Sequence, residues 1–429
     1  ICQNEAVDWD ESYTWHLVTK LSLKDMIAMT ASDVHPPLYY LLVKLAMKIF
    51  GQSILVAKLV SVAGGIGTML LAATKVRKNW GIKAAIPLIL VVGLGPQYIY
   101  YNVNVRMYSW MVFFVFGAAL WAFDIMKTGS RKAWIWFVLF SLGGVYTQYF
   151  AVVPLFLLYF MVFMYLLVYA RKKIWSFFLA SVCTVLGYLP WLGVVWNTLQ
   201  RDASEQKGID SADLALNKLF KWAFQTHIVW SVYLPIILFV LCIGLLIGYW
   251  KTRKREENFF LCSMAALLFV ANLCCTLLVQ HMNHFWDYRY LLGAVIGFWM
   301  ILCIMVAREK LFTWITFMIW IGITCLSSYT AMSATELDTV AWINAAKEVL
   351  APLQEEKKIV YTFPTYDILY EYYLPDAEFI WYADVDFYEK ETGSFYMIAW
   401  GGRDFDSSVK EERKVKENWV GSIRLEEGV

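Results

Sequence analysis

Two short motifs near the start of the chain hold the residues best suited to chemistry. The first is an adjacent acid pair, Asp10 and Glu11, and the second is the run Asp33-Val34-His35-Pro36-Pro37. A carboxylate that is partly removed from water becomes a stronger base and can take a proton from a hydroxyl group. A histidine beside two prolines can orient such a loop. The acid pair, with His35 not far along the chain, therefore predicts proton transfer.

The composition excludes a single soluble domain of 429 residues. Hydrophobic residues make up 60% of the 429 residues, charged residues make up 17%, and the mean hydropathy is +0.52. No globular core needs that much apolar sequence, so we predict an all-α polytopic membrane protein. The net charge of +2 gives no indication of nucleic acid as a partner. About ten apolar runs are long enough to span: 53–74, 84–101, 107–126, 133–149, 150–170, 174–197, 231–250, 258–279, 290–307 and 311–331.

The connections between these runs differ in charge. Sixteen Lys and Arg residues fall in one alternating set of loops and six in the other. The positive-inside rule therefore predicts that the first set is cytoplasmic. The acid pair, Arg106, the tip 146–149, the segment 281–289 and the C-terminus are then expected on the extracytoplasmic face of the cell membrane.

Three regions are expected along the chain. Residues 1–52 form an outer loop with the acid pair and a juxtamembrane helix, Leu38–Phe50, which is too short to span and carries two lysines. Residues 53–332 form the transmembrane bundle. Residues 333–429 form a small extracytoplasmic α/β domain, with a helix at 337–351 and strands at 358–363, 377–381, 395–400 and 419–425. The chain opens at Ile1, and we expect that a first transmembrane helix is missing before it.

Two arginines on the arginine-poor side are candidates for binding a phosphate. Arg106 and Arg289 each lie within a residue or two of an apolar helix. A charged side chain in lipid is unfavourable in free energy unless it is paired or faces a polar site. The planar guanidinium group suits a phosphate, although either side chain could instead reach lipid headgroups. Asp287 could pair with an arginine or contact a sugar.

Other polar and aromatic residues are weaker candidates. His281, His284 and Asp287 have the spacing of one helical face, but no fourth ligand lies nearby, so no metal site is assigned and a divalent metal stays possible. Several residues could hydrogen-bond or stack on a sugar, with interfacial packing as the alternative in an aromatic-rich chain. These substrate-binding candidates are Tyr108, Tyr146, Gln148, Tyr149 and Tyr290.

The order of the motifs resembles the GT-C membrane glycosyltransferases of family 39, the protein O-mannosyltransferase and aminoarabinose-transferase type. The resemblance runs from Asp10 to about residue 331. The matching pieces are Asp10-Glu11, Asp33–Leu38 with Phe50-Gly51, Arg106–Ser109, Tyr146–Phe150, Tyr188–Trp191 and Arg289–Leu292.

The resemblance implies the roles of several residues. It implies that Asp10 is the catalytic base and Glu11 a site-shaping neighbour, that Arg289, Arg106 and His35 lie on the phosphate side, and that a polyprenyl-phosphate sugar is the donor. Such enzymes transfer the sugar in one inverting displacement.

Other functions remain open at this stage. A transporter or flippase for lipid-linked saccharides would also carry outward arginines and many aromatic residues. It would commonly show internal repeats and charges at mid-membrane, which this sequence lacks apart from Asp124 near a helix end. A non-catalytic subunit with the same fold is a third reading. The acceptor could be a protein, a wall polymer or another lipid.

Overall fold

The computed structural model describes residues 7, 9–33, 35–199, 255–281, 288–323 and 325–326, and, from the C-terminal part of the chain, Tyr372 and five strands. The chain divides into two compact units. One unit comprises Ile1–Ser22 with Ala331–Val429, and the other comprises Leu23–Thr330. The sequence-based boundaries at residues 52 and 332 remain predictions.

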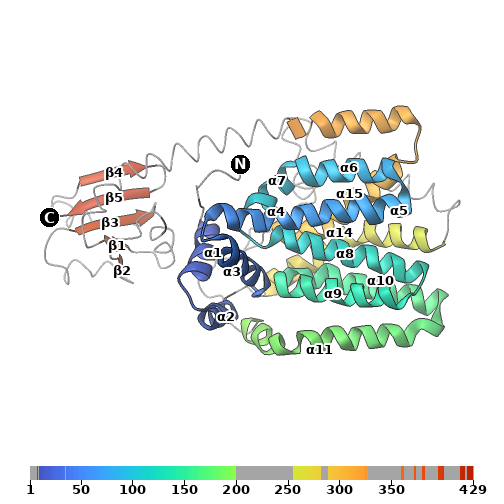
Figure 1. Ribbon diagram of the computed structural model, residues 1–429, viewed down its shortest axis with the longest axis horizontal. Helices are drawn as coiled ribbons and strands as arrows, with labels where there is room; N and C mark the ends of the chain where they lie inside the picture. The colour runs from blue at the N-terminus through green and yellow to red at the C-terminus, as the bar shows by residue number, and fades with distance from the viewer. Residues whose placement is uncertain are drawn as a thin grey trace. The chain divides into compact units, whose positions relative to one another are not determined.

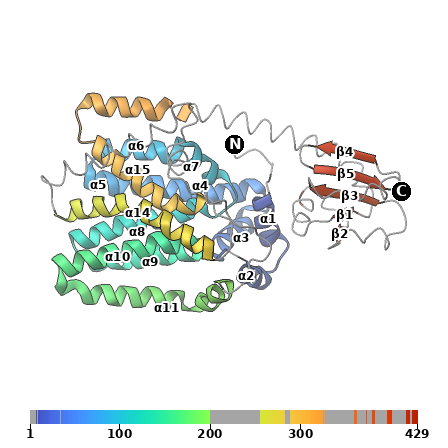
Figure 2. The ribbon, with the colours of Figure 1, turned by 180° about the vertical axis from the view of Figure 1, so that it is seen from behind.

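The unit Leu23–Thr330 is a helical bundle (Figure 1). Its labelled helices are α2 (Leu23–Ser32), α3 (Leu38–Phe50), α4 (Ile54–Leu71), α5 (Arg77–Trp80), α6 (Ile82–Leu94), α7 (Pro96–Val103), α8 (Tyr108–Lys127), α9 (Arg131–Thr147), α10 (Val152–Tyr169), α11 (Ile174–Leu199), α14 (Arg255–His281) and α15 (Leu292–Val306). A further apolar helix, Leu311–Ile323, follows α15. A π-helical turn, η1 (Ala72–Val76), joins α4 to α5, and three short 3₁₀ turns are η2 (Tyr149–Ala151), η3 (Arg171–Lys173) and η5 (Tyr288–Leu291). Figure 2 shows α14 and α15 on the face turned away in Figure 1.

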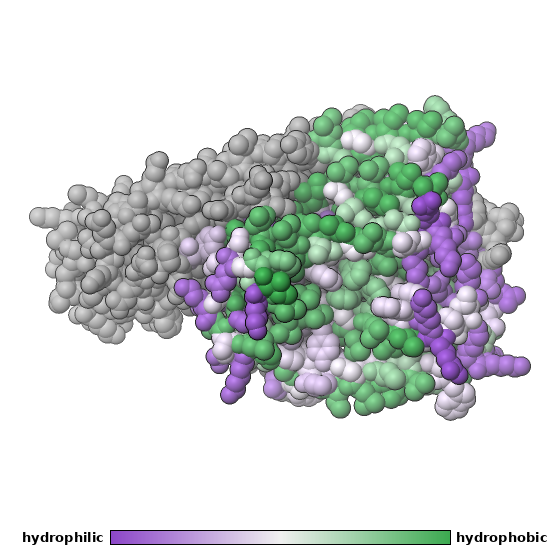
Figure 3. Space-filling view, in the orientation of Figure 1, coloured by the Kyte–Doolittle hydropathy of each residue, from purple (hydrophilic) through white to green (hydrophobic). Residues whose placement is uncertain are grey.

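The bundle is built to lie in a membrane. Among the described residues, five helical stretches are long and apolar enough to span: Ile54–Trp80, Tyr108–Lys127, Tyr149–Tyr169, Arg171–Thr198 and Arg289–Val306. A sixth is the bent pair α6 and α7. The prediction of a polytopic α-helical protein is confirmed, and the expected span at 231–250 lies outside the described residues. Figure 3 shows apolar residues over the middle of the bundle and a dense hydrophilic border at the end where α5 lies.

The run 84–101, expected to be one helix, is broken. The helices α6 and α7 meet at 58°. Gly95 between them has extended backbone angles, φ −67° and ψ 133°, and Pro96 opens α7. Proline is well suited to the first turn of a helix, where its missing N–H needs no partner, but it cannot continue the hydrogen bonds of the preceding helix. The bend therefore follows from one Gly-Pro step.

The helix α3 has the bounds predicted for the juxtamembrane helix, Leu38–Phe50, and its place relative to the membrane stays a prediction. It follows Pro36-Pro37 and ends at Gly51, whose φ of +95° is a conformation that favours glycine. One face buries Tyr39, Tyr40 and Val43, whereas Leu45, Ile49 and Phe50 are exposed. An amphipathic helix with exposed apolar residues suits the membrane boundary.

The helices α4 and α8 pack at close range because α4 presents glycines to α8. A Cβ atom placed on Gly64 would lie 2.9 Å from the backbone carbon of Ser109 and 2.9 Å from the backbone nitrogen of Trp110. The indole of Trp110 donates to the carbonyl of Val60, at 2.8 Å, across the same interface. The close approach fixes the start of α8 against α4, and this start carries the candidate site.

We expect Gly64→Ala to lower the thermal unfolding midpoint, because the added methyl must push two backbones apart at a cost of about 1–3 kcal/mol. Gly193→Ala is the matched control, since a Cβ there meets nothing within 4 Å. Thermal unfolding of both variants in the same detergent measures the difference. Equal midpoints for the two variants would contradict the tight α4–α8 packing.

One end of the bundle, named here the basic end, carries the Lys and Arg residues of the lysine-rich loops. Lys75 pairs with Asp124, and Arg308 pairs with Glu257. Further contacts tie this end together: Trp80 Nε1 donates to Glu257 at 2.8 Å, Lys127 Nζ to Asn79 at 3.0 Å, and Lys173 Nζ to the carbonyl of Thr128 at 3.1 Å. These bonds join η1, α5, α8, η3 and α14 at the same end of the bundle.

The other unit contains α1 (Trp9–Thr19) and a five-stranded sheet. The strands are β1 (Ile359–Tyr361), β2 (Phe379–Trp381), β3 (Phe395–Trp400), β4 (Lys416–Val420) and β5 (Ile423–Gly428), in the order β2-β1-β3-β5-β4. The strand β1 is parallel to β2 and β3, and β5 is antiparallel to β3 and β4.

One predicted strand of the sheet is wrong. The sequence predicts a single strand over 419–425, but β4 and β5 are an antiparallel pair in which Val420 faces Ile423. Only Gly421 and Ser422 separate them, the length of a tight hairpin loop. The predicted strand at 395–400 is confirmed by β3, and the helix expected at 337–351 lies outside the described residues.

Candidate active site

A buried arginine lies where α7 passes into α8. Arg106 has 3% of its surface exposed. Its backbone N–H donates to the carbonyl of Asn104 at 2.7 Å, and its own carbonyl accepts from the hydroxyl of Ser61 on α4 at 3.4 Å. The turn is therefore held by α4 as well as by its own hydrogen bonds.

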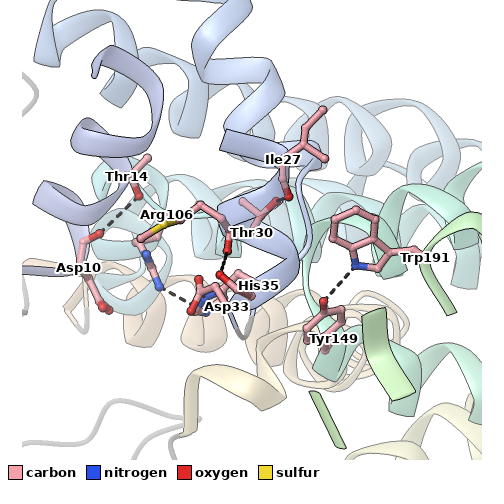
Figure 4. Close-up of polar contacts among 11 residues, drawn as sticks. Asp10, Thr14, Ile27, Thr30, Asp33, His35, Arg106, Tyr149 and Trp191 are labelled. Atoms are coloured by element: carbon pink, nitrogen blue, oxygen red, sulfur yellow. Dashed lines mark hydrogen bonds and ion pairs between the residues drawn. The ribbon is translucent and has the colours of Figure 1, made fainter. Parts of the chain in front are cut away.

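The Asp33–Pro37 motif places a histidine on this arginine. An Nη of Arg106 lies 3.2 Å from Nε2 of His35, and Nδ1 of His35 lies 3.2 Å from a carboxylate oxygen of Asp33 (Figure 4). A guanidinium group can only donate, so Nε2 must accept the hydrogen bond. The ring proton is then on Nδ1 and is donated to Asp33. His35 therefore links Asp33 to Arg106.

The start of α3 explains why His35 reaches Arg106. The hydroxyls of Tyr39 on α3 and Ser61 on α4 are 2.7 Å apart, and both side chains are fully buried. Ser61 is also the residue that contacts the carbonyl of Arg106. Two prolines restrict the backbone between His35 and α3. One hydrogen-bonded chain therefore fixes α3, α4 and the Arg106 turn together.

The second predicted arginine lies at the same end of the bundle. The guanidinium carbon of Arg289, in η5, is 5.6 Å from the ring centre of Tyr108 and 5.9 Å from that of Tyr290. Tyr108 is the first residue of α8, two residues after Arg106. Tyr290 stacks on Phe150 of η2, with ring centres 4.0 Å apart. Cation–π contacts of this kind contribute about 0.5–2 kcal/mol. The structure thus brings Arg106, His35, Tyr108, Arg289 and Tyr290 together, and we name this group the arginine site.

The turn at the end of α9 holds Tyr146, Gln148 and Tyr149, whose side chains have different surroundings. Gln148 is buried, with 1% of its surface exposed, and its backbone N–H closes α9 on the carbonyl of Gly144 at 3.0 Å. Tyr146 faces α11 instead: its hydroxyl donates to the carbonyl of Gly187 at 3.0 Å, and its ring meets Tyr188 edge-on. Tyr149 accepts from the indole of Trp191 at 3.0 Å (Figure 4). Of the predicted sugar contacts, Tyr146 is therefore turned away from the arginine site.

The acid pair lies in the first turn of α1, in the other unit. The carbonyl of Asp10 accepts from the hydroxyl of Thr14 at 3.3 Å, so Asp10 is an integral part of this helix. Successive residues of an α-helix project about 100° apart. Asp10 and Glu11 therefore point in different directions, which suits the different roles predicted for them.

Two expected features lie outside the described residues: Asp287 and His284. Among the residues that the structure describes, no group of three His, Cys, Asp or Glu side chains could hold a metal ion.

One buried cation was not singled out by the sequence analysis. Lys58, on the buried face of α4, has 5% of its surface exposed. The one feature of the sequence that could have indicated a buried cation here is a lysine within the apolar run 53–74.

Comparisons with known proteins connect this arrangement to a fold. No protein-family model matches the chain, and no curated protein matches it by sequence. Two solved structures of ArnT from Cupriavidus metallidurans are similar. The structure bound to undecaprenyl phosphate has a TM-score of 0.61 and the apo structure one of 0.64. Each is 11% identical to this chain, covering 92% of it and 88% of ArnT. The chain shares the polytopic helical fold of these two ArnT structures.

Proposed function

We propose that the protein is a membrane glycosyltransferase that moves a sugar from a polyprenyl phosphate to an acceptor hydroxyl. The observation that carries this proposal is the arginine site: a buried guanidinium, oriented by His35 and Asp33, with a second guanidinium held over Tyr108. Guanidinium groups at the border of a membrane bundle suit an anionic group on a lipid. The similarity to a structure that contains undecaprenyl phosphate supports the choice of donor. Membership of family 39 belongs to the same proposal.

The proposed reaction is a single displacement at the anomeric carbon. The acceptor oxygen forms a bond to this carbon while the bond from the carbon to the phosphate oxygen breaks with its electron pair. Asp10 takes the proton from the acceptor hydroxyl. The arginines stabilise the negative charge that develops on the departing phosphate. The configuration inverts, and the products are the glycosylated acceptor and polyprenyl phosphate.

The charge distribution supports the orientation that we propose. The basic end holds the lysine-rich loops, and the arginine site is formed by His35, the α7–α8 turn, η2 and η5. The positive-inside rule favours a cytoplasmic basic end. The arginine site, and with it the transfer, is then extracytoplasmic.

A transporter of lipid-linked saccharides is the alternative function. Alternating access requires opposing parts of the bundle to move apart at each end in turn. In this protein the ion pairs Lys75–Asp124 and Arg308–Glu257, with the bond from Trp80 to Glu257, tie neighbouring helices at the basic end. This closed basic end favours an enzyme that works from one face.

Vesicles containing the full chain and radiolabelled polyprenyl-phosphate sugars test the proposal. We expect the label to leave the lipid phosphate and appear on an acceptor with inverted anomeric configuration. Label that stays on polyprenyl phosphate but changes leaflet would identify a transporter instead. Supplying protein, wall-polymer and lipid acceptors in parallel identifies the acceptor class.

A further inference from the structure

The bend between α6 and α7 removes the regular partner of one carbonyl group. In an α-helix the carbonyl of each residue accepts from the N–H four residues later. The carbonyl of Val91 follows this rule and accepts from Gly95 at 2.8 Å. For Val92 the residue four positions later is Pro96, which has no N–H. Val92 is buried, so its carbonyl needs a donor from within the protein.

A side chain beyond the bend supplies this donor. Nδ2 of Asn102, on α7, donates to the carbonyl of Val92 at 3.0 Å. A carbonyl can only accept, so the amide nitrogen of Asn102 must be the atom that faces it. The bond joins two residues on opposite sides of the 58° bend. Asn102 therefore takes the place of the missing N–H of residue 96 and links the two halves of the broken helix.

The helix α4 leaves room for the Asn102 amide. Figure 1 shows α7 beside α4 and α6. A Cβ atom on Gly65 of α4 would lie 2.6 Å from Cγ and Oδ1 of Asn102 and 2.7 Å from Nδ2. The amide lies directly on the glycine backbone, so a larger residue at position 65 would displace it. Two features far apart in the sequence, Gly65 and Pro96, thus both involve the Asn102 side chain.

A short connection transmits the position of Asn102 to Arg106. The backbone N–H of Asn104 donates to the carbonyl of Tyr100 at 3.0 Å, and the N–H of Arg106 donates to the carbonyl of Asn104 at 2.7 Å. The helix α7 has eight residues and is therefore about 12 Å long. A change of about 10° in the bend would move its far end by about 2 Å. A shift of that size would break the 3.2 Å contact between Arg106 and His35.

We infer that Asn102 is a positioning residue of the arginine site: it sets the bend between α6 and α7 and thereby the place of Arg106 beside His35. Its effect on sugar transfer rests on the proposed function, whereas its effect on the bend does not. A misplacement of about 1 Å at a reacting centre can lower a rate about a hundredfold. Asn102 thus acts on the transfer through the backbone, without touching the substrate.

Asn102→Leu tests the inference because leucine has a similar size but no donor. We expect kcat/KM for the lipid donor to fall about ten- to a hundredfold, with the KM for the acceptor little changed. Spin-labelled amino acids in place of Ile86 and Tyr100, which are exposed on α6 and α7, measure the bend, and their distance should shift. Asn79→Leu is the matched control: it removes a hydrogen bond to Lys127 at the basic end and should change neither measurement. An unchanged label distance in Asn102→Leu would overturn the inference.

Adding Pro96→Ala to Asn102→Leu separates positioning from stability. Residue 96 then again has an N–H for the carbonyl of Val92, so the thermal unfolding midpoint, lowered by Asn102→Leu, should recover. The helix should straighten, and the backbone positions of the two labels should separate toward roughly 21 Å, the length of fourteen residues in a continuous helix. Transfer should therefore stay low. Recovery of transfer together with the midpoint would show that Asn102 serves stability alone.

Gly65→Ala displaces the same amide from the side of α4 and covers an Asn102→Leu variant that fails to fold. Alanine is a better helix former than glycine, so α4 itself is not weakened. We expect the label distance and the transfer rate to change as in Asn102→Leu. Gly193→Ala is the control, since a Cβ there meets nothing within 4 Å. An unchanged label distance in Gly65→Ala would count against Asn102 as the residue that sets the bend.

Binding of undecaprenyl phosphate to the purified full chain distinguishes failure of this inference from failure of the proposed function. When Arg289→Ala weakens binding but Asn102→Leu leaves the label distance and binding unchanged, only the role of Asn102 fails. When the label distance shifts in Asn102→Leu but neither variant weakens binding, Asn102 still sets the bend. The arginine site is then not a phosphate site, and the proposed function fails.

Discussion

Asp10→Asn is expected to abolish sugar transfer while the protein still folds, inserts and binds the lipid donor. The amide has nearly the same shape as the carboxylate but cannot accept the acceptor proton. General-base catalysis contributes about 10²–10⁴-fold to a rate, so the rate constant at saturating substrates should fall by that factor. Transfer from a radiolabelled polyprenyl-phosphate sugar measures the rate, and binding of undecaprenyl phosphate measures the intact donor site.

Two matched variants make the Asp10 result specific. Asp25→Asn is the same chemical change at an exposed acid in the first turn of α2 and should leave transfer unchanged. Glu11→Gln changes the neighbouring acid, which points about 100° away on α1, and should affect transfer less than Asp10→Asn does. Normal turnover by Asp10→Asn would exclude Asp10 as the base and would favour a non-catalytic protein.

Arg289→Ala is expected to impair the use of the lipid donor more than the use of the acceptor. The guanidinium lies over Tyr108 at 5.6 Å, beside the Arg106 turn, and in the proposed reaction it stabilises the departing phosphate. Removing one preorganised donor to a developing anion typically costs about 10²–10³-fold in rate. We expect the KM for the lipid donor to rise and the rate to fall, with the KM for the acceptor little changed. Initial rates at varied concentrations of each substrate separate these effects.

The control for Arg289 is an arginine at the basic end. Arg77 is exposed in α5, and Arg77→Ala should leave the dependence on both substrates unchanged. Equal increases in the KM for donor and acceptor in Arg289→Ala would argue against a phosphate role. They would instead assign Arg289 to packing between η5 and α8.

Much of the architecture follows from local sequence. Apolar runs of sufficient length predict membrane helices because every backbone polar group in lipid must be satisfied within its own segment. The helix Leu38–Phe50 was predicted with its observed bounds, since Pro36-Pro37 precedes it and Gly51 ends it. The break between α6 and α7 was missed because hydropathy alone does not register one Gly-Pro step inside an apolar run.

The candidate site was predictable in its residue types but not in its geometry. The sequence by itself determined that arginines, a histidine and an acid pair flank a membrane bundle, because a charged residue among apolar spans stands out against its surroundings. Only the tertiary structure decided that His35 accepts from Arg106, that Arg289 reaches Tyr108, that Tyr146 turns to α11, and that Lys58 is buried. The physical reason is that hydropathy and turn residues act within a few residues of the chain. Contacts between helices far apart in sequence depend on how side chains of several helices fit together.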